Sequence, residues 1–260
     1  MTRLLHIADL HFGDESPALV EAFTTYCRDN PPDAIIATGD FTQAGRRREF
    51  DVARAFFDTL DAPIVGAPGN HDVPSYALDH RFITPWQRYD RIVGPVVQRS
   101  VITDQIHTET LHTARRAQMR PDWSLGRVSN RDLAALIAKF GPGPQPVRIA
   151  GCHHPLLAPD DADGRANTRR GREAAIALAP HCDLVLTGHL HRTFALPIHA
   201  PSHTCWFVGA STAFSARTRI EPAGFNEITI TPDEFHLTRH IARPDLSFEP
   251  GESFKLARKP

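Results

Sequence analysis

Short apolar runs of strand length recur along the chain, and five of them are followed at once by polar residues. These runs are 4–8, 34–38, 64–67, 147–152 and 183–187. Between the first three runs, apolar residues recur at helical spacing, first after the helix-start signal Ser16-Pro17 and again from Phe50 to Leu60. Because buried strands alternate with amphipathic helices, the pattern predicts parallel βαβ units and an α/β fold.

Further elements are predicted beyond residue 73. Apolar spacing predicts the helices, and short apolar segments bounded by turn residues predict the strands. In chain order they are a helix over 82–93, strand segments within 96–112, a helix over 133–140 after capping residues 129–132, a loop over 160–172, a helix over 174–179 and strands at 204–209, 225–230 and 235–241.

The length of the chain suits one large domain. With 260 residues it can bury a substantial core, and we expect a single domain over residues 1–260. The stretch Gly141–Pro146 is rich in glycine and proline, but it is short and strands of the same kind resume after it. We therefore interpret it as a loop within that domain.

Charge, cysteine spacing and the N-terminus restrict the class of protein. The formal net charge of -1 argues against a general basic surface for nucleic acid or an anionic membrane. The four cysteines are far apart, which fits reduced thiols rather than a disulfide framework or a zinc site. No signal peptide precedes Asp9, and no apolar run has membrane-spanning length. We expect a soluble cytoplasmic protein, of an oligomeric state that the sequence leaves open.

Residues of the kinds that bind metals follow the five apolar runs. Because ligands gather at the carboxyl ends of strands in open α/β sheets, we expect these side chains to meet. Asp9 and His11 alternate and are expected to leave their strand on one face. Carboxylates and imidazoles without thiolates suit Mn, Fe, Zn or Co, and seven ligands suit two ions that share a bridging carboxylate. The seven are Asp9, His11, Asp40, Asn70, His153, His189 and His191.

The segment Gly69–Asp72 contains two further candidates. An Asn-His-Asp turn alone is typical of a polar loop, and only the other motifs give it chemical meaning. Asn70 is neutral, so it can bind a metal without adding negative charge opposite a phosphate. His71 is expected to donate a hydrogen bond or a proton to the reacting group, with Asp72 fixing its tautomer.

Five motifs resemble, in order, those of the calcineurin-like metallophosphoesterase superfamily. They span about 70% of the chain and are Asp9-x-His11, Gly39-Asp40, Gly69-Asn70-His71-Asp72, His153-x-Pro155 and Gly188-His189-x-His191. The resemblance implies a four-layer α/β/β/α sandwich of two mixed sheets, with a dinuclear metal site at the strand C-terminal ends and the final strands completing the second sheet. It also implies one ion on Asp9, His11 and His191, another on Asn70, His153 and His189, and Asp40 as the bridge.

The reaction expected of such a site is hydrolysis of a phosphate diester. A hydroxide that bridges two divalent or mixed-valence ions is nucleophilic near neutral pH, because coordination lowers the pKa of water from about 15.7 to about 7. It would attack phosphorus in line with the departing oxygen.

Two features of the site stay open at this stage. The resemblance places a ligand two residues before Pro155, which favours His153 over His154; His154 then either faces the substrate or packs. Arginines either bind a second phosphate or a nucleotide, or are merely solvated. These arginines are Arg46, Arg47, Arg115, Arg116, Arg169, Arg170 and Arg217.

A narrower resemblance concerns the substrate. The segments 111–116 and 209–217, with Phe225-Asn226, resemble a bacterial branch of cyclic-AMP phosphodiesterases, in which Asn usually stands in place of His112. Small diesters, cyclic nucleotides among them, are therefore the expected substrates, and the role of His112 is open. The alternatives are a UDP-diacylglucosamine pyrophosphohydrolase, which needs an apolar acyl site, a DNA-processing nuclease, which needs a basic groove, and a non-catalytic scaffold of the same fold.

Overall fold

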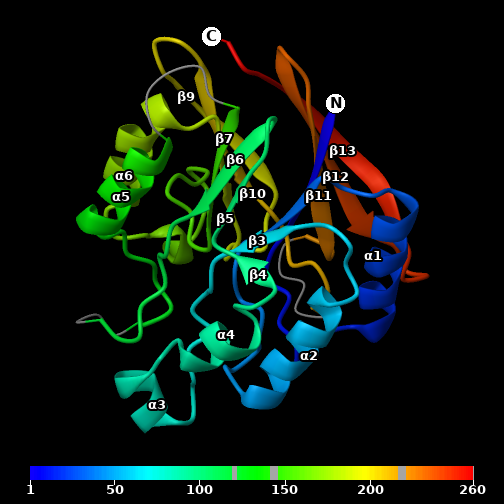
Figure 1. Cartoon of the computed structure of the whole chain (residues 1–260), viewed down its shortest axis with the longest axis vertical. Coiled ribbons are helices and arrows are strands. Elements are labelled where there is room, and N and C mark those ends of the chain that lie inside the picture. The colour runs from blue at the N-terminus through cyan, green and yellow to red at the C-terminus, as the bar shows by residue number, and fades with distance from the viewer. Residues whose placement is uncertain (119–121, 141–145, 216–220, 260) are drawn as a thin grey trace.

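Two mixed β-sheets face each other and helices cover their outer sides (Figure 1). This architecture comes from a computed structural model that describes residues 1–118, 122–140, 146–215 and 221–259. The segments 141–145 and 216–217, for which a loop and part of a branch motif were predicted, lie outside the described residues.

The first sheet has seven strands in the order β13-β12-β11-β1-β2-β3-β4. Strands β1 to β4 run parallel, and β11, β12 and β13 extend the sheet in antiparallel fashion beyond β1. Its strands are β1 (Thr2–Ile7), β2 (Ala34–Ala37), β3 (Ile64–Gly66), β4 (Val97–Gln98), β11 (Gly224–Ile230), β12 (Glu234–Ala242) and β13 (Phe248–Ala257).

The second sheet has six strands in the order β5-β6-β7-β8-β10-β9. Its four central strands are parallel, and the two edge strands β5 and β9 are antiparallel to their neighbours. Its strands are β5 (Ser100–Ile102), β6 (Ile106–Thr110), β7 (Val147–Cys152), β8 (Leu184–Thr187), β9 (Phe194–His199) and β10 (Thr204–Gly209).

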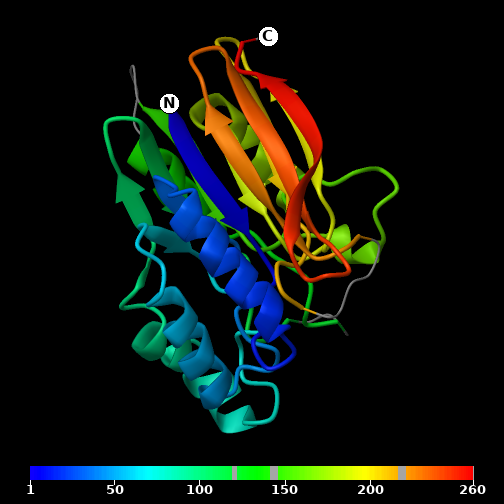
Figure 2. The same cartoon turned by 90° about the vertical axis from the view of Figure 1, so that its right-hand side faces the viewer.

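The helices form the two outer layers, with α5 and α6 to the left of the strands in Figure 1 and α1 to the right. Figure 2 shows α1 and α2 together along one side of the first sheet. The helices are α1 (Pro17–Asp29), α2 (Arg47–Phe57), α3 (Leu78–Ile83), α4 (Gln87–Ile92), α5 (Asn130–Phe140) and α6 (Gly171–Leu178), with short 3₁₀ turns η1 (Gly164–Ala166) and η2 (Ala179–His181).

Apolar side chains fill three layers of core. Between the sheets, Leu4 and Ile36 pack in one buried cluster with Ile149 of the facing sheet. Because side chains alternate along a strand, Leu5 and Ile35 point to the other face, where they join the core beneath α1 and α2. A third cluster lies between the second sheet and the helices α5 and α6. These layers confirm the predicted four-layer α/β/β/α sandwich.

The fold corrects three of the sequence predictions. The helix expected over 82–93 is two short helices, because Pro85 has no amide hydrogen and restricts Thr84, which is not helical. The edge strands β9 and β13 were not predicted, since both expose many of their side chains. The last strands do not all complete the second sheet: β11 pairs with β1, so β11, β12 and β13 belong to the first.

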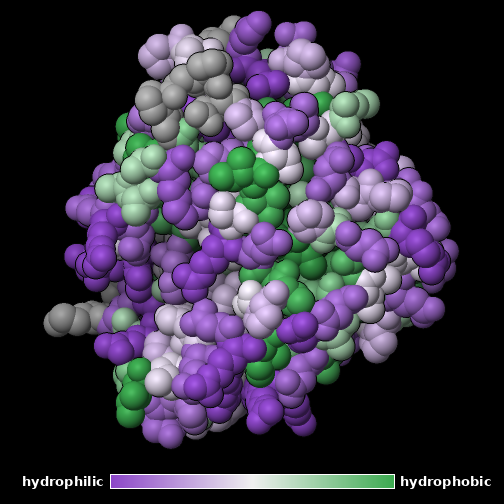
Figure 3. Space-filling view, in the orientation of Figure 1, coloured by the Kyte–Doolittle hydropathy of each residue, from purple (hydrophilic) through white to green (hydrophobic). Residues whose placement is uncertain are grey.

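Neither the surface nor the cysteines change the fold class described above. Hydrophilic side chains predominate on the face drawn in Figure 3, with apolar ones in a central band. Within the described ranges, none of the helices combines the length and apolar character needed to cross a bilayer. All four cysteines are buried free thiols.

Candidate metal centre

The seven predicted ligands lie just beyond the carboxyl ends of five central strands, and the structure brings all of them together. Three of these strands belong to the first sheet and two to the facing sheet, so the side chains converge at one end of the inter-sheet layer. Asp9 and His11 follow β1, Asp40 follows β2, Asn70 follows β3, His153 follows β7, and His189 and His191 follow β8.

Asp9 and His11 are not strand residues, which corrects the reason given for their convergence. Strand β1 ends at Ile7, and both residues have left-handed backbone, with φ of 52° and 49°. Of the seven non-glycine residues with positive φ among the described residues, five are predicted ligands: Asp9, His11, Asp40, His189 and His191. Such backbone costs about 1–3 kcal/mol per residue and clusters at functional sites.

One group of side chains forms around Asp9. The Oδ1 atom of Asp9 lies 3.3 Å from His191 Nε2 and 3.9 Å from His11 Nε2. The two imidazole nitrogens are 3.4 Å apart. The other carboxylate oxygen, Oδ2, accepts the backbone N–H of His189 at 2.8 Å, which ties β1 to the loop after β8. Three candidate ligand atoms thus surround one point.

A second group forms around His153. Its Nε2 atom lies 3.1 Å from Asn70 Oδ1 and 3.3 Å from Asp40 Oδ2. Its Nδ1 donates to the carbonyl of Thr38 at 2.8 Å. A metal-binding histidine typically donates its other ring N–H to a backbone carbonyl or carboxylate in this way. The rings of His153 and His189 are 5.1 Å apart, so His189 belongs to the same group.

Asp40 lies between the two groups. Its Oδ2 is 3.3 Å from His153 Nε2 and 4.0 Å from His11 Nε2, while its Oδ1 accepts the backbone N–H of His71 at 2.8 Å. A side chain at position 69 would overlap this carboxylate, because a Cβ built on Gly69 falls on Asp40 Oδ1. The glycine of the Gly-Asn-His-Asp motif is therefore needed for close approach of the two loops.

The buried polar atoms of the site fit a bound cation. Asp9 Oδ1 and His189 Nε2 are buried and have no hydrogen-bond partner, although His191 Nε2 lies near the former. Unpaired buried groups of this kind are costly unless an ion or water satisfies them. Two sets of three predicted ligands present their ligand atoms within 4.8 Å of one another, Asp9 with His11 and His191, and Asp9 with Asp40 and His153. The donor set of carboxylate oxygens and imidazole nitrogens suits a divalent transition metal.

At four of the candidate ligands, electrostatics favour the charge states that metal binding requires. Burial would raise the pKa of Asp9 and Asp40, but neighbouring histidines, chiefly His191 and His153 respectively, outweigh it and lower both. Burial lowers the pKa of His11 to about 4 and that of His189 well below its usual value. The centre therefore offers ionised carboxylates and neutral rings at His11 and His189, the forms in which these side chains bind metals. At His153 the carboxylates of Asp40 and Asp9 outweigh burial and raise the pKa to about 9, so a metal bound there would displace a proton.

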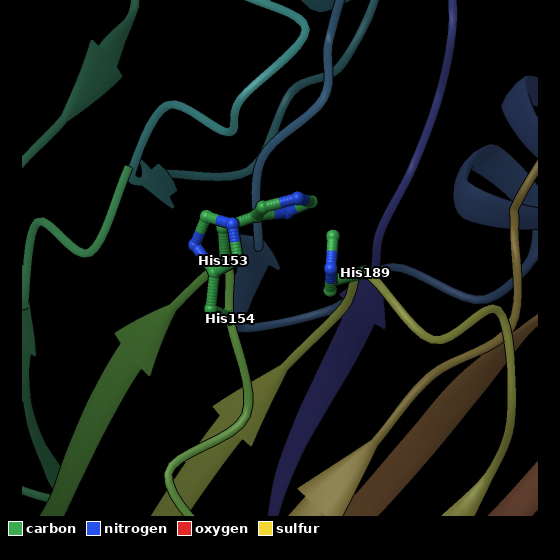
Figure 4. A group of neighbouring side chains, drawn as sticks. All are labelled: His153, His154 and His189. Carbon is green, nitrogen blue, oxygen red and sulfur yellow. The ribbon is translucent and has the colours of Figure 1, made fainter. Parts of the chain in front are cut away.

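His154 lies beside His153 and His189 (Figure 4), but its ring already has two hydrogen-bond partners. Its Nε2 donates to the carbonyl of Ser124 at 2.7 Å, and its Nδ1 lies 2.9 Å from the hydroxyl of Thr113. Its position would allow it to share an ion with its two neighbours, yet doing so would break one of these bonds. We favour the packing role for His154 on that ground.

His71 is oriented by a backbone group and not by Asp72. His71 Nδ1 lies 2.6 Å from the carbonyl oxygen of Gln43, and since a carbonyl only accepts, Nδ1 carries the hydrogen. Asp72 instead accepts the backbone N–H groups of Phe41, Thr42 and Gly69. The predicted role of Asp72 in fixing the tautomer is therefore wrong. Burial, with help from Asp40, raises the pKa of Asp72 to about 6.

The groups that hold these imidazoles were not predicted from the sequence. Thr38 and Gln43 act through backbone carbonyls, which have no signature in side-chain type. Two of the arginines also have structural partners, because Arg115 and Arg116 donate to the carbonyls of Arg127 and Phe82. Arg217 lies outside the described residues.

The family is shown by comparison with known proteins. Residues 2–193 match the model of the calcineurin-like phosphoesterase family. Because this match covers most of the chain, the chain belongs to that family, and by class it is a metal-dependent phosphoric ester hydrolase. The recognised superfamily is thereby confirmed.

Individual relatives agree with the branch of cyclic-AMP phosphodiesterases predicted from the sequence. A probable cyclic nucleotide phosphodiesterase of Synechococcus sp. is 24% identical over 241 residues, which is 88% of each chain. The 3',5'-cyclic adenosine monophosphate phosphodiesterase CpdA of Haemophilus influenzae is 25% identical over 205 residues, covering 73% of this chain and 70% of the relative. These names agree with the predicted branch.

Among solved structures, the fold is similar to that of the purple acid phosphatase PPD1 of yellow lupin. The TM-score is 0.70 at 14% identity, and the alignment covers 99% of this chain and 54% of the phosphatase. At this identity the similarity concerns the fold alone. It agrees with the two-sheet sandwich described above.

Proposed function

We propose that this chain is a dinuclear-metal phosphodiesterase that hydrolyses small phosphate diesters, cyclic nucleotides among them. The observation that carries the proposal is the pair of side-chain groups joined by Asp40 at one end of the inter-sheet layer. The names of the two similar cyclic nucleotide phosphodiesterases support the choice of substrate.

In this proposal the ligands divide between two ions. Asp9, His11 and His191 would hold one ion, and Asn70, His153 and His189 the other, while Asp40 lies between the groups as the bridge. Mn, Fe, Zn or Co would suit the mixture of oxygen and nitrogen donors. When bound, the two ions supply a water activated for attack and neutralise the charge of the phosphate.

The remaining residues act on the substrate and on the ligands. His71 is partly exposed at the edge of the site, and because Nδ1 is held by Gln43, Nε2 is the nitrogen left for the substrate. From there it would donate a hydrogen bond to the phosphate or a proton to the departing oxygen. Asp72 has a different role. Its carboxylate accepts three backbone N–H groups and so stabilises the loop that holds Asp40.

Metal content and hydrolysis measured on the same preparation test the proposal. Protein purified without chelator should contain about two transition-metal ions per chain and hydrolyse bis-p-nitrophenyl phosphate, with loss of activity after chelation and recovery with Mn. Asp40→Ala should lose both metal and activity, whereas Arg28→Ala, a change of an exposed side chain on α1, should lose neither. Two bound ions without turnover in the presence of Mn would favour a non-catalytic scaffold.

A further inference from the structure

A cavity of about 430 Å³ is lined by none of the seven candidate metal ligands, but one of its lining residues, Pro68, stands two residues before Asn70. We call it the Trp86–His112 pocket. Figure 1 shows α4 below and α5 to the upper left of the short strands β4 and β5, and side chains of both helices line the cavity. Its walls include Pro68, Trp86, Arg99, His112, Asp132 and Lys139.

Two residues that line the pocket are close along the chain to residues of the centre. Pro68 precedes Asn70 by two residues, a separation of at most about 7 Å along the backbone. Another lining residue, His112, precedes Thr113, whose hydroxyl lies 2.9 Å from the ring Nδ1 of His154. These short separations put the pocket within reach of a ligand whose other end lies at the metals.

His112 has an unused hydrogen-bonding group. Its Nε2 atom is buried and has no hydrogen-bond partner, while the ring packs edge to face on Trp86 with centroids 4.4 Å apart. Burial, with Arg115 and Arg99 nearby, lowers the pKa of His112 to about 4, so the ring is neutral and has one donor and one acceptor nitrogen. An unpaired buried nitrogen of this kind is a group that a ligand can satisfy.

The charges of the pocket are already compensated. Arg99 donates to Asp90 at 2.9 Å, and Lys139 lies 2.6 Å from Glu109 Oε2. Because both cations have carboxylate partners, the pocket does not select for a second phosphate. The number of charged and polar groups on its walls also disfavours an acyl chain. What remains is an aromatic face at Trp86 and hydrogen-bonding groups at its edge, which suit an uncharged, planar heteroaromatic ring.

We propose that the Trp86–His112 pocket binds the nucleobase of a nucleotide whose phosphate lies at the metal centre. Trp86 contributes the apolar contact and His112 a hydrogen bond to the ring edge. This inference rests on the proposed function and extends it, because it assigns the part of the substrate that the metals do not hold.

Binding of two probes to the Mn-loaded protein tests the pocket. AMP has a base, whereas ribose 5-phosphate has the same phosphate and sugar without one, and both affinities are measured by calorimetry. The wild type should bind AMP at least tenfold more tightly than ribose 5-phosphate. His112→Phe keeps a ring against Trp86 but removes the hydrogen bond, so AMP affinity should fall about five- to tenfold. The affinity for ribose 5-phosphate should stay the same.

A control variant and an activity assay separate the possible failures. His236→Phe makes the same change on β12, away from the pocket, and should leave both affinities unchanged. Equal binding of the two probes by the wild type, or an equal loss of both in His112→Phe, would overturn the nucleobase site. If one of these results is found but the wild type still hydrolyses bis-p-nitrophenyl phosphate, the nucleobase site is wrong and the proposed phosphodiesterase function stands. If the wild type does not hydrolyse that diester, the proposed function is wrong as well.

Discussion

His71 shows how much a single residue depends on groups that the sequence does not reveal. The Gln43 carbonyl sets its tautomer, and the backbone N–H of His71 in turn holds Asp40 at 2.8 Å. The residue therefore has two separable functions: its backbone positions a candidate ligand, and its side chain is proposed to act on the substrate.

Removing the imidazole of His71 should separate these functions. We expect His71→Ala to lower kcat by about 10²- to 10⁴-fold, because a general acid contributes an effect of that size, while the backbone bond to Asp40 and the metal content persist. The measurement is turnover of bis-p-nitrophenyl phosphate together with metal analysis. Loss of metal in this variant would mean that His71 is a ligand. His80→Ala on α3 is the control and should change neither turnover nor metal content.

His6 makes stability depend on pH. It is fully buried between the sheets, where its Nε2 lies 3.0 Å from the hydroxyl of Thr38 and its Nδ1 3.3 Å from Asn226 Nδ2. Burial lowers the pKa of His6 to about 3, against about 6.5 in an unfolded chain. The unfolded state therefore binds a proton that the folded state does not bind, and the contribution of His6 is complete above pH 6.5 and lost as pH falls toward 3.

A neutral replacement tests this pH dependence. As the pH is lowered from 6.5 to 4.5, the free energy of unfolding should fall less steeply for His6→Gln than for the wild type. The difference between the two slopes should be roughly 1 kcal/mol per pH unit. Urea unfolding at several pH values, with both proteins in the same metal-free state, gives the comparison. Parallel pH profiles for the two proteins would show that His6 is not the titrating group.

At the scale of elements, the loop before α2 links helix capping to the site. Glu49 is buried, and its Oε2 accepts the backbone N–H of Ala44 at 2.8 Å and that of Arg46 at 3.2 Å. The loop that it closes contains Gln43, the residue that orients His71. The Glu49 carboxylate, at the third position of α2, thus caps the start of the helix and also holds the loop that orients the His71 imidazole.

Shortening Glu49 should affect both stability and activity. We expect Glu49→Ala to lower the unfolding free energy by about 1–2 kcal/mol through loss of the cap, and to reduce kcat through a less ordered Gln43. Glu49→Gln retains an acceptor oxygen and should lose less of each. Thermal unfolding and turnover are the measurements, and wild-type values for Glu49→Ala would contradict the linkage.

Other elements show where the apolar pattern was informative. Leu19, Phe23 and the run from Phe50 to Leu60 predicted α1 and α2, because burying one helix face requires that spacing. The edge strand β9 escaped prediction, since its exposed positions and Pro197 weaken the signal that a central strand shows.

At the scale of the whole molecule, the C-terminal strands join the inter-sheet core. Phe235 and Leu237 of β12 lie in the same buried cluster as Leu4 of β1 and Leu186 of β8. Residues far apart in the sequence therefore share one core. This contact supports the prediction, which remains to be tested, that residues 1–260 unfold as a single domain.

A cavity in that shared core tests the prediction. Phe235 is fully buried, so Phe235→Ala should cost about 3–5 kcal/mol and lower the single unfolding transition of the chain as a whole. Scanning calorimetry of the metal-free protein gives the result. Two transitions, of which only one moves, would indicate two independently folding parts.

The sequence by itself determined the α/β class, the central strands and the seven candidate ligands, because apolar periodicity and residue type are local properties. Tertiary structure decided which atoms meet. It gave five of the ligands a left-handed backbone, assigned the orientation of His71 to Gln43 rather than Asp72, and joined β11 to β1. It also formed the Trp86–His112 pocket. These features depend on backbone groups and on contacts between distant segments, which no local pattern of side chains specifies.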